Sequence, residues 1–276
     1  MTFKAIFLAL AYFLNSPSFQ KREYVRLLLR YNRIPRFHEK KICFFTSKKK
    51  RYMFRVPDVP SFLAQYKSLF VDECSRFSND TEKNFTIIDF GANIGMSLLY
   101  FYITYPNAIV TAFEADPNIF SILKNNISVL PTSERNRLKI INKAVWVKET
   151  TLSFSGDGSD GGRVSDEENC SAKIQAINVR EFLSKYEHVD FLKIDVEGSE
   201  RVIIPALSDN LSKIDRIFLE YHSEFNTNQC LADIISVLSN AGFRLFIHEG
   251  YCGRHPYTES PQVAGYDMML EIYARR

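Results

Sequence analysis

The 276-residue chain has few cysteines, and they show no organised pattern. The five cysteines are odd in number and far apart, and none stands in a C-x-x-C pair or beside a histidine pair with the spacing of a zinc site. These absences argue against a disulfide framework and a structural metal, so we expect a reduced, cytosolic protein. The sequence also contains no internal repeat and no low-complexity tract.

Long hydrophobic runs are missing as well. The continuous apolar run from Ala5 to Leu14 is too short to cross a bilayer, which takes about 20 residues. A basic, helix-like stretch follows it without a clear A-x-A cleavage site, so a signal peptide is the weaker interpretation. We expect a helix that packs on its own domain or on a second copy of the chain in a homodimer. A helix on a membrane surface is the intermediate alternative.

Acidic residues are scarce at the start of the chain. Residues 1–57 hold fourteen Lys and Arg against two Glu, whereas the remainder holds 21 basic and 30 acidic residues. A basic segment of this density is attracted to anionic lipid, nucleic acid or an anionic glycan, although a solvated face is an equal alternative. Nucleic acid is not expected as a partner, because no recognised nucleic-acid motif accompanies the charge. We divide the chain into a basic, helical N-terminal extension, residues 1–80, and a main domain, residues 81–276.

From about Asn84 onward, strand-like and helix-like segments alternate. Apolar and β-branched runs predict strands at residues 86–90, 108–115, 138–146, 189–198, 215–222, 243–250 and 266–275. Helical patterns and capping residues predict helices at residues 94–105, 117–130, 199–209 and 231–242. This alternation predicts an α/β fold with a doubly wound parallel sheet, whose ligands bind at the carboxyl ends of the strands.

The first of these strands ends in the turn DFGANIG, residues 89–95. Gly91 and Gly95 lie between a strand and a helix, where the missing Cβ lets a ligand approach the backbone, although such a turn can also serve packing alone. The G-x-G-x-x-G spacing is absent and Asp89 is an unfavourable neighbour for a pyrophosphate, so an NAD-dependent oxidoreductase is disfavoured. A positively charged ligand such as S-adenosylmethionine suits the turn, and Glu114 at the next strand end suits its ribose hydroxyls.

Four blocks, DFGANIGMSLLYF, FEADPNIFSILKNNI, NKAVW and FLKIDVEGSE, follow one another over about residues 84–200, and LEYH continues them at residues 219–222. Together they resemble the FkbM family of S-adenosylmethionine-dependent methyltransferases. The resemblance implies a Rossmann-like class I methyltransferase sheet, mostly parallel, with an antiparallel last strand that residues 266–275 can supply. Asn93 replaces the middle glycine of the wider superfamily, in agreement with the FkbM pattern.

The resemblance also implies which residues bind S-adenosylmethionine. The turn at residues 89–95 would hold the methionine part, and Glu114 would bind the ribose. The residues after Glu114 and the end of the third strand would contact the adenine. The cofactor residues predicted in this way are Asp89, Gly91, Ala92, Asn93, Gly95, Glu114, Ala115, Asp116, Asn142, Ala144 and Asp195.

Candidate acceptor-side residues stand at the ends of the fourth and fifth predicted strands. Methyl transfer to an alcohol needs orientation of two reactants and a proton acceptor. His222 has the pKa best suited to accept a proton near neutral pH, with Asp195 and Glu220 as further catalytic candidates. The alternatives are structural roles: His222 as a hydrogen-bonded histidine, and Asp195 as a carboxylate that caps the following helix. Glu197 and Glu220 could bind substrate hydroxyls. These four residues, Asp195, Glu197, Glu220 and His222, could also hold a divalent cation. No chelating spacing demands one, so no metal is predicted.

The segment from Ser153 to Asn169 holds four glycines and several acidic residues. This composition predicts a mobile hairpin or lid between two strand-like segments. Closure over the site would exclude water and bring Arg163 to the substrate. A solvated loop without ligand contact is the alternative.

Together these features predict an S-adenosylmethionine-dependent O-methyltransferase that acts on a hydroxyl of a sugar, a glycan or a related natural product. The basic extension favours an acceptor that is anionic, lipid-linked or held at the membrane, with peripheral membrane contact through residues 1–57. A nucleic-acid methyltransferase is one alternative, although DVEG at residues 195–198 stands where an N-methylating type would show an Asn/Asp-Pro-Pro-aromatic element. A non-catalytic protein that keeps the fold for binding is the other.

Overall fold

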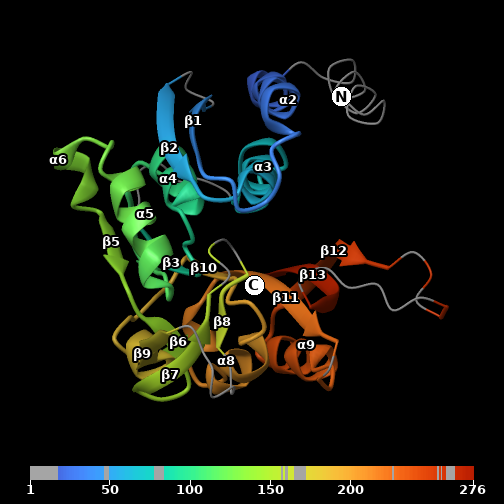
Figure 1. Cartoon of the computed structure of the whole chain (residues 1–276). Helices are drawn as coiled ribbons and strands as arrows, with labels where there is room; N and C mark the ends of the chain where they lie inside the picture. The colour runs from blue at the N-terminus through green and yellow to red at the C-terminus, as the bar shows by residue number, and fades with distance from the viewer. Residues whose placement is uncertain are drawn as a thin grey trace.

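A seven-stranded sheet forms the centre of the protein (Figure 1). The computed structural model describes residues 18–46, 50–77, 84–156, 158, 161–164, 172–225, 227–253, 255, 257–258 and 265–276. The strands stand in the order β12-β13-β11-β10-β3-β4-β5, all parallel except β13, which runs antiparallel to β11 and β12. The predicted sheet with an antiparallel last strand is therefore confirmed. The strand bounds are β3 (Phe85–Phe90), β4 (Ala108–Phe113), β5 (Leu138–Ile141), β10 (Phe191–Ile194), β11 (Arg216–Glu224), β12 (Arg244–Cys252) and β13 (Tyr266–Arg275).

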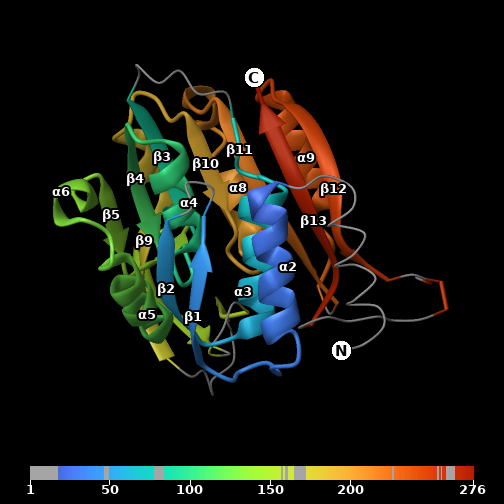
Figure 2. The same ribbon diagram turned by 90° about the horizontal axis from the view of Figure 1, so that it is seen from above.

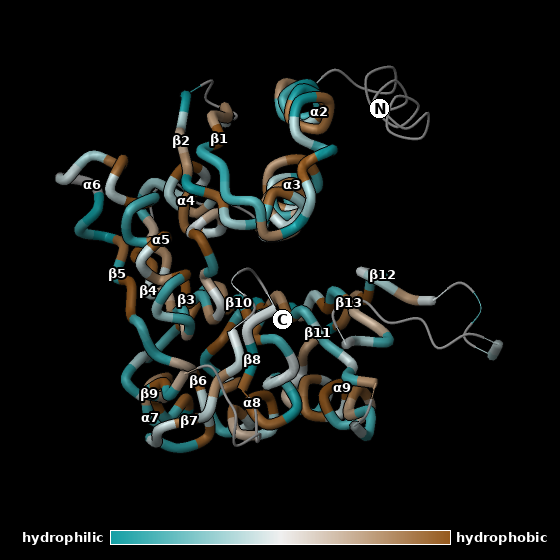
Figure 3. The backbone as a smooth tube through the Cα atoms, in the orientation of Figure 1, coloured by the Kyte–Doolittle hydropathy of each residue, from teal (hydrophilic) through white to brown (hydrophobic). Residues whose placement is uncertain are grey.

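Helices cover both faces of this sheet, as the doubly wound prediction requires. In β3, Phe85 and Ile87 join one hydrophobic cluster while Ile88 and Phe90 join the other, so the strand is buried on both sides. Figure 3 shows hydrophobic segments in the covering helices, as in α8 and α9. The first group of helices is α4 (Met96–Thr104), α5 (Pro117–Ile127) and the short α6 (Thr132–Arg135). The helices that follow later in the chain are α7 (Val179–Ser184), α8 (Glu200–Ala206), η2 (Leu211–Lys213) and α9 (Leu231–Asn240).

The N-terminal residues add a further layer over the α4 side of the sheet (Figure 2). It consists of α2 (Phe19–Tyr31), the antiparallel strands β1 (Lys40–Phe45) and β2 (Arg51–Val56), α3 (Val59–Tyr66) and the π-helix η1 (Lys67–Val71). These elements share one hydrophobic cluster with α4, in which the ring of Phe70 stacks on Tyr66 at 5.2 Å and meets Tyr100 edge-on at 5.6 Å. The described part of the extension, residues 18–46 and 50–77, is therefore packed on the main domain.

The prediction of a helical extension was incomplete, because it missed the hairpin formed by β1 and β2. Alternate residues of β2 are buried, which is the pattern of a strand with one face on the core. Part of the basic charge is also neutralised locally, since Arg26, Arg36 and Arg55 form ion pairs with acidic neighbours. The apolar run at residues 5–14 lies outside the described residues. None of the described helices is long and apolar enough to cross a membrane.

A second, smaller sheet has the order β6-β9-β7-β8. The single strand predicted at residues 138–146 was wrong, because β5 ends at Ile141 and β6 begins at Ala144 in this other sheet. Asn142 makes the break, since its side-chain amide donates hydrogen bonds to the carbonyls of Glu114 and Ala115. The hairpin predicted after Ser153 is present where β7 and β8 pair. The bounds are β6 (Ala144–Trp146), β7 (Thr150–Ser155), β8 (Arg163–Val164) and β9 (Ala172–Asn178), the last of which was not predicted.

The close contact between the glycine turn and β10 generates the first prediction. Gly91 has φ +89°, and a Cβ there would lie 1.8 Å from the backbone oxygen of Asp195. We expect Gly91→Ala to lower the free energy of unfolding by about 3 kcal/mol or more, because left-handed strain adds to a backbone clash. Urea denaturation measures this change.

Gly158 provides the matched control, since it has φ +80° and a Cβ there would meet no atom within 4 Å. Gly158→Ala should cost only the strain of the left-handed conformation, about 1 kcal/mol. Equal losses for the two variants would show that the contact with Asp195 is not what excludes a side chain from position 91.

Candidate active site

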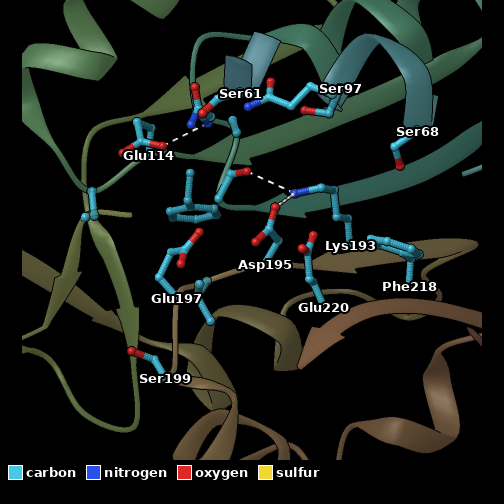
Figure 4. A pocket seen from close by; sticks show the side chains of 18 of the residues that line it. Ser61, Ser68, Ser97, Glu114, Lys193, Asp195, Glu197, Ser199, Phe218 and Glu220 are labelled. Atoms are coloured by element: carbon cyan, nitrogen blue, oxygen red, sulfur yellow. Dashed lines mark hydrogen bonds and ion pairs between the residues drawn. The ribbon is translucent and has the colours of Figure 1, made fainter. Parts of the chain in front are cut away.

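A cavity of about 470 Å³ opens at the carboxyl ends of the central strands (Figure 4). One part of its wall is the glycine turn after β3 and the residues after β4, and another is the ends of β10 and β11. The remainder comes mainly from α3 and η1, from β12 and β13, and from the second sheet. Of the predicted site residues, those that line the cavity are Gly91, Ala92, Asn93, Glu114, Ala115, Asp116, Ala144, Arg163, Asp195, Glu197 and Glu220.

The glycine turn is tied to the neighbouring strand by its backbone. The N–H groups of Gly91 and Ala92 both donate to the carbonyl of Phe113, at 3.0 and 2.9 Å. Asn93 adopts a left-handed conformation with φ +47°, and its N–H donates to Glu114 Oε2 at 2.8 Å. The turn therefore presents bare backbone to the cavity in a fixed position.

Glu114 joins the turn to the start of α5. Its second oxygen, Oε1, accepts a 2.8 Å hydrogen bond from the N–H of Asp116, which caps α5. Burial raises the pKa of Glu114 to about 7, against the opposing effect of the two backbone N–H groups. The carboxyl group is thus held at the cavity wall and changes charge near neutral pH.

Lys193 is a buried residue that the sequence reasoning missed. Its Nζ donates to the carbonyl of Gly91 and to Asp195 Oδ2, both at 3.0 Å, and lies 3.5 Å from Asp89 Oδ1. Burial disfavours the charged amine, but the carboxylates of Asp195 and Asp89 outweigh it and raise the pKa of Lys193. A single lysine inside the apolar strand FLKI was the signal available in the sequence.

Three residues predicted to contact the cofactor do not line the cavity. Asp89 is fully buried beneath the turn, where it accepts a 2.6 Å hydrogen bond from the Ser97 hydroxyl. Gly95 faces α5, since a Cβ there would lie 3.2 Å from the side chain of Ile127. Asn142 is engaged with the carbonyls after β4. These three positions support the wall of the cavity and do not form it.

His222 also lies behind the wall, which differs from its predicted place as a base. Its Nδ1 is 3.3 Å from Glu200 Oε1, and its Nε2 is 3.6 Å from Glu197 Oε2 and 3.9 Å from Glu220 Oε1. Burial alone would lower its pKa, but the carboxylates of Glu197 and Glu200 outweigh burial and raise the pKa well above its ordinary value. His222 does not line the cavity, so its role as the base stays a prediction.

The acceptor-side carboxylates occupy the floor of the cavity. Glu220 lines it, and burial together with the charge of Asp195 raises the pKa of Glu220 to about 7. Glu197 accepts a 3.0 Å hydrogen bond from the Tyr266 hydroxyl, and the guanidinium of Arg163 lies 5.7 Å from the centre of the Tyr266 ring. The hairpin residue Arg163 therefore reaches the same floor.

The N-terminal layer supplies a wall that the sequence analysis did not assign to the site. These residues stand outside every motif of the recognised pattern, and only the packing of α3 and η1 against the sheet places them here. A π-helical turn such as η1 is often found at functional sites. The additional wall residues with polar side chains are Ser61, Gln65, Lys67, Ser68 and Asp72 from this layer, and Glu249 and Glu271 from β12 and β13.

The sheet has the strand order of a class I methyltransferase, with an antiparallel seventh strand. Its cavity is lined by a glycine turn and by an acidic residue at the end of the next strand. These features define a class I S-adenosylmethionine-dependent methyltransferase. The profile of the Methyltransferase FkbM domain matches residues 89–245. The chain belongs to the FkbM methyltransferase family, and its methyl donor is S-adenosylmethionine.

Two relatives in sequence and one solved structure are similar to this chain. "Methyltransferase 1" of Beauveria bassiana is 27% identical over 179 residues, which cover 56% of this chain and 71% of the relative. The "31-O-demethyl-FK506 methyltransferase FkbM" of Streptomyces tacrolimicus is 22% identical over 211 residues, covering 64% and 80%. The crystal structure of "Methyltransferase FkbM" from Methylobacillus flagellatus has a TM-score of 0.50 at 15% identity, over 78% of this chain and 54% of that one, and supports the fold.

The buried ammonium of Lys193 generates the second prediction. We expect Lys193→Met to lower the free energy of unfolding by about 3 kcal/mol, because it leaves the carboxylate of Asp89 buried without its cation. Urea denaturation at pH 7 measures the change. Lys143→Met is the control, since Lys143 lines the same cavity but is partly exposed, with its nearest carboxylate 3.9 Å away. Its effect should stay within about 0.5 kcal/mol, and a similar effect for both variants would contradict the role of Lys193.

Proposed function

We propose that this methyltransferase acts on a hydroxyl group of a sugar, a glycan or a related natural product. The observation that carries the proposal is the cavity itself, in which carboxylates and side-chain hydroxyls stand opposite the glycine turn. Carboxylates accept hydrogen bonds from alcohols, and they repel phosphates and other anions. The S. tacrolimicus relative supports the proposal, since its name gives an O-demethyl compound as its substrate.

The residues around the glycine turn fit S-adenosylmethionine. Gly91 and Ala92 line the cavity where the methionine part would lie, and Glu114 offers a fixed carboxylate to the ribose hydroxyls. Ala115, Asp116 and Ala144 line the adjoining wall, where the adenine would lie. The bound cofactor supplies a methyl group that is activated by the positive charge on its sulfur.

Glu220 is the residue that we propose to accept the proton of the reacting hydroxyl. Asp195 is less suited, because one of its oxygens is engaged by Lys193 at 3.0 Å. Glu220 lines the cavity, and the basic nitrogen that pairs with it among the described residues, Nε2 of His222, is 3.9 Å away, beyond hydrogen-bond distance. The proton would pass from the acceptor oxygen to the carboxylate as the oxygen forms its bond to the methyl carbon.

The charges of the cavity and of the extension suit different parts of one acceptor. Glu220, Glu249 and Glu271 line the cavity, and their carboxylates suit an acceptor part that is rich in hydroxyls. The basic residues 1–57 support peripheral contact with an anionic membrane surface, where a lipid-linked acceptor would be held on the cytoplasmic side. The same carboxylates disfavour the nucleic-acid alternative.

The pKa of Glu114 leads to a test of the cofactor site by calorimetry. The ribose hydroxyls donate hydrogen bonds, so the ionised carboxylate is the binding form and affinity should rise with pH through about 7. We expect S-adenosylmethionine to bind about tenfold more tightly at pH 8 than at pH 6. Glu114→Gln should bind more weakly at both values, with a flat pH profile, and NAD should give no signal. A pH dependence that persists in Glu114→Gln would assign it to another group.

The role of Glu220 can be measured by transfer of radiolabelled methyl groups to a set of sugars and natural-product alcohols. Glu220→Gln should lower the rate at least about a hundredfold and leave the affinity for S-adenosylmethionine unchanged. Asp209→Asn, an exposed carboxylate paired with Arg180 outside the cavity, is the control and should keep the rate of the wild-type protein. Full turnover by Glu220→Gln would refute this role. Cofactor binding without transfer to any acceptor would favour the non-catalytic alternative.

A further inference from the structure

Three side chains that could ligate a metal converge at the floor of the cavity, with Asp195 and Glu197 lining it and His222 directly behind them. Asp195 and Glu197 come from the segment after β10, and His222 comes from β11. Each offers a ligand atom, and these atoms all lie within 4.8 Å of one another. We propose that Asp195, Glu197 and His222 form a binding site for a divalent first-row cation of the manganese type.

The orientation of His222 is the first support for this site. Glu200 is fully buried and its carboxylate accepts hydrogen bonds from the N–H groups of Val196 and Gly198, so its position is fixed. His222 Nδ1 meets this carboxylate at 3.3 Å, which directs Nε2 toward Glu197. A histidine that binds a metal usually donates its other ring N–H to a carboxylate in this way.

The environment of Nε2 is the second, independent support. The side chain of His222 is 2% exposed, and Nε2 forms no hydrogen bond among the described residues. Its nearest carboxylate oxygens, on Glu197 and Glu220, are 3.6 and 3.9 Å away. Ligands bound at about 2.1 Å from one cation stand roughly 3 to 4 Å apart, so the 3.6 Å between Nε2 and the Glu197 oxygen is long for a hydrogen bond and suits an intervening cation.

The neighbouring groups fix the positions of the two carboxylates. Lys193 engages Oδ2 of Asp195, so Oδ1 can ligate. The Tyr266 hydroxyl holds Glu197 by a 3.0 Å hydrogen bond. Glu197 itself has φ +53°, a conformation with a cost in free energy that is found most often where a side chain must be aimed at a functional site. With Glu200 and Glu220 nearby, the floor carries an excess of negative charge that suits a dication.

The ligand types indicate which cation the site prefers. One imidazole with two carboxylates suits a first-row ion such as Mn²⁺, because Mg²⁺ and Ca²⁺ prefer oxygen ligands alone. A cation here would also bind the acceptor oxygen and help it release its proton to Glu220. The O–H bond then breaks, the oxygen bonds to the methyl carbon, and the C–S bond breaks with its electron pair on sulfur. This consequence rests on the proposed function, whereas binding of the cation does not.

Electron paramagnetic resonance of Mn²⁺ tests the site without an acceptor. The full chain is freed of metal with EDTA and titrated with MnCl₂, and the signal of free Mn²⁺ reports binding. We expect one Mn²⁺ per chain, with affinity at least tenfold lower in Glu197→Gln and in His222→Gln. Glu249→Gln is the matched control, because it removes a carboxylate from the same cavity that is not a proposed ligand.

Calorimetric binding of S-adenosylmethionine to each variant confirms that it is folded. Loss of Mn²⁺ binding in both ligand variants, with Glu249→Gln unchanged, supports the site. Absence of stoichiometric binding to the wild-type chain, or equal losses in all three variants, overturns it. A wild-type chain that binds S-adenosylmethionine but not Mn²⁺ overturns the metal site alone, whereas one that binds Mn²⁺ but not S-adenosylmethionine supports the site and overturns the proposed function.

Discussion

The ammonium group of Lys193 connects the ends of the two central strands, and both halves of the cavity depend on this contact. It donates to the carbonyl of Gly91 on the cofactor side and to Asp195 on the acceptor side. Asp89 supplies a further negative charge from below. A charge this deeply buried is stable only when it is paired and hydrogen-bonded, so the geometry of the site and the stability of the fold rest on the same atoms.

The sheet order brings residues that are distant in sequence to this point. The ends of β3 and β10 are adjacent although about a hundred residues separate them along the chain, and β11 follows on the other side of β10. The Gly91 position shows how closely these segments approach, because only a residue without a side chain fits against the carbonyl of Asp195. The glycine turn and the ends of β10 and β11 thereby line one continuous cavity.

Local patterns allowed most of the sheet and much of the cofactor side to be predicted from the sequence. The β-branched run before Asp89, the turn glycines and the acidic Glu114 are each recognisable within a few residues. Lys193 and its partners could not be predicted, because a buried ion pair depends on strands that meet only after folding. For the same reason the contacts of His222 could not be predicted, since Glu200 and Glu197 come close to it only after folding.

The wall supplied by α3 and η1 lies outside the segment that defines the family, residues 89–245. Substitutions at residues 59–72 can therefore reshape one wall of the cavity without changing the turn at Gly91 or the carboxylate of Glu114. Selection can act on these two parts of the molecule separately. A single methyl-transferring framework could in this way acquire new acceptors during evolution by exchanging the layer that covers it, while the chemistry at the strand ends is retained.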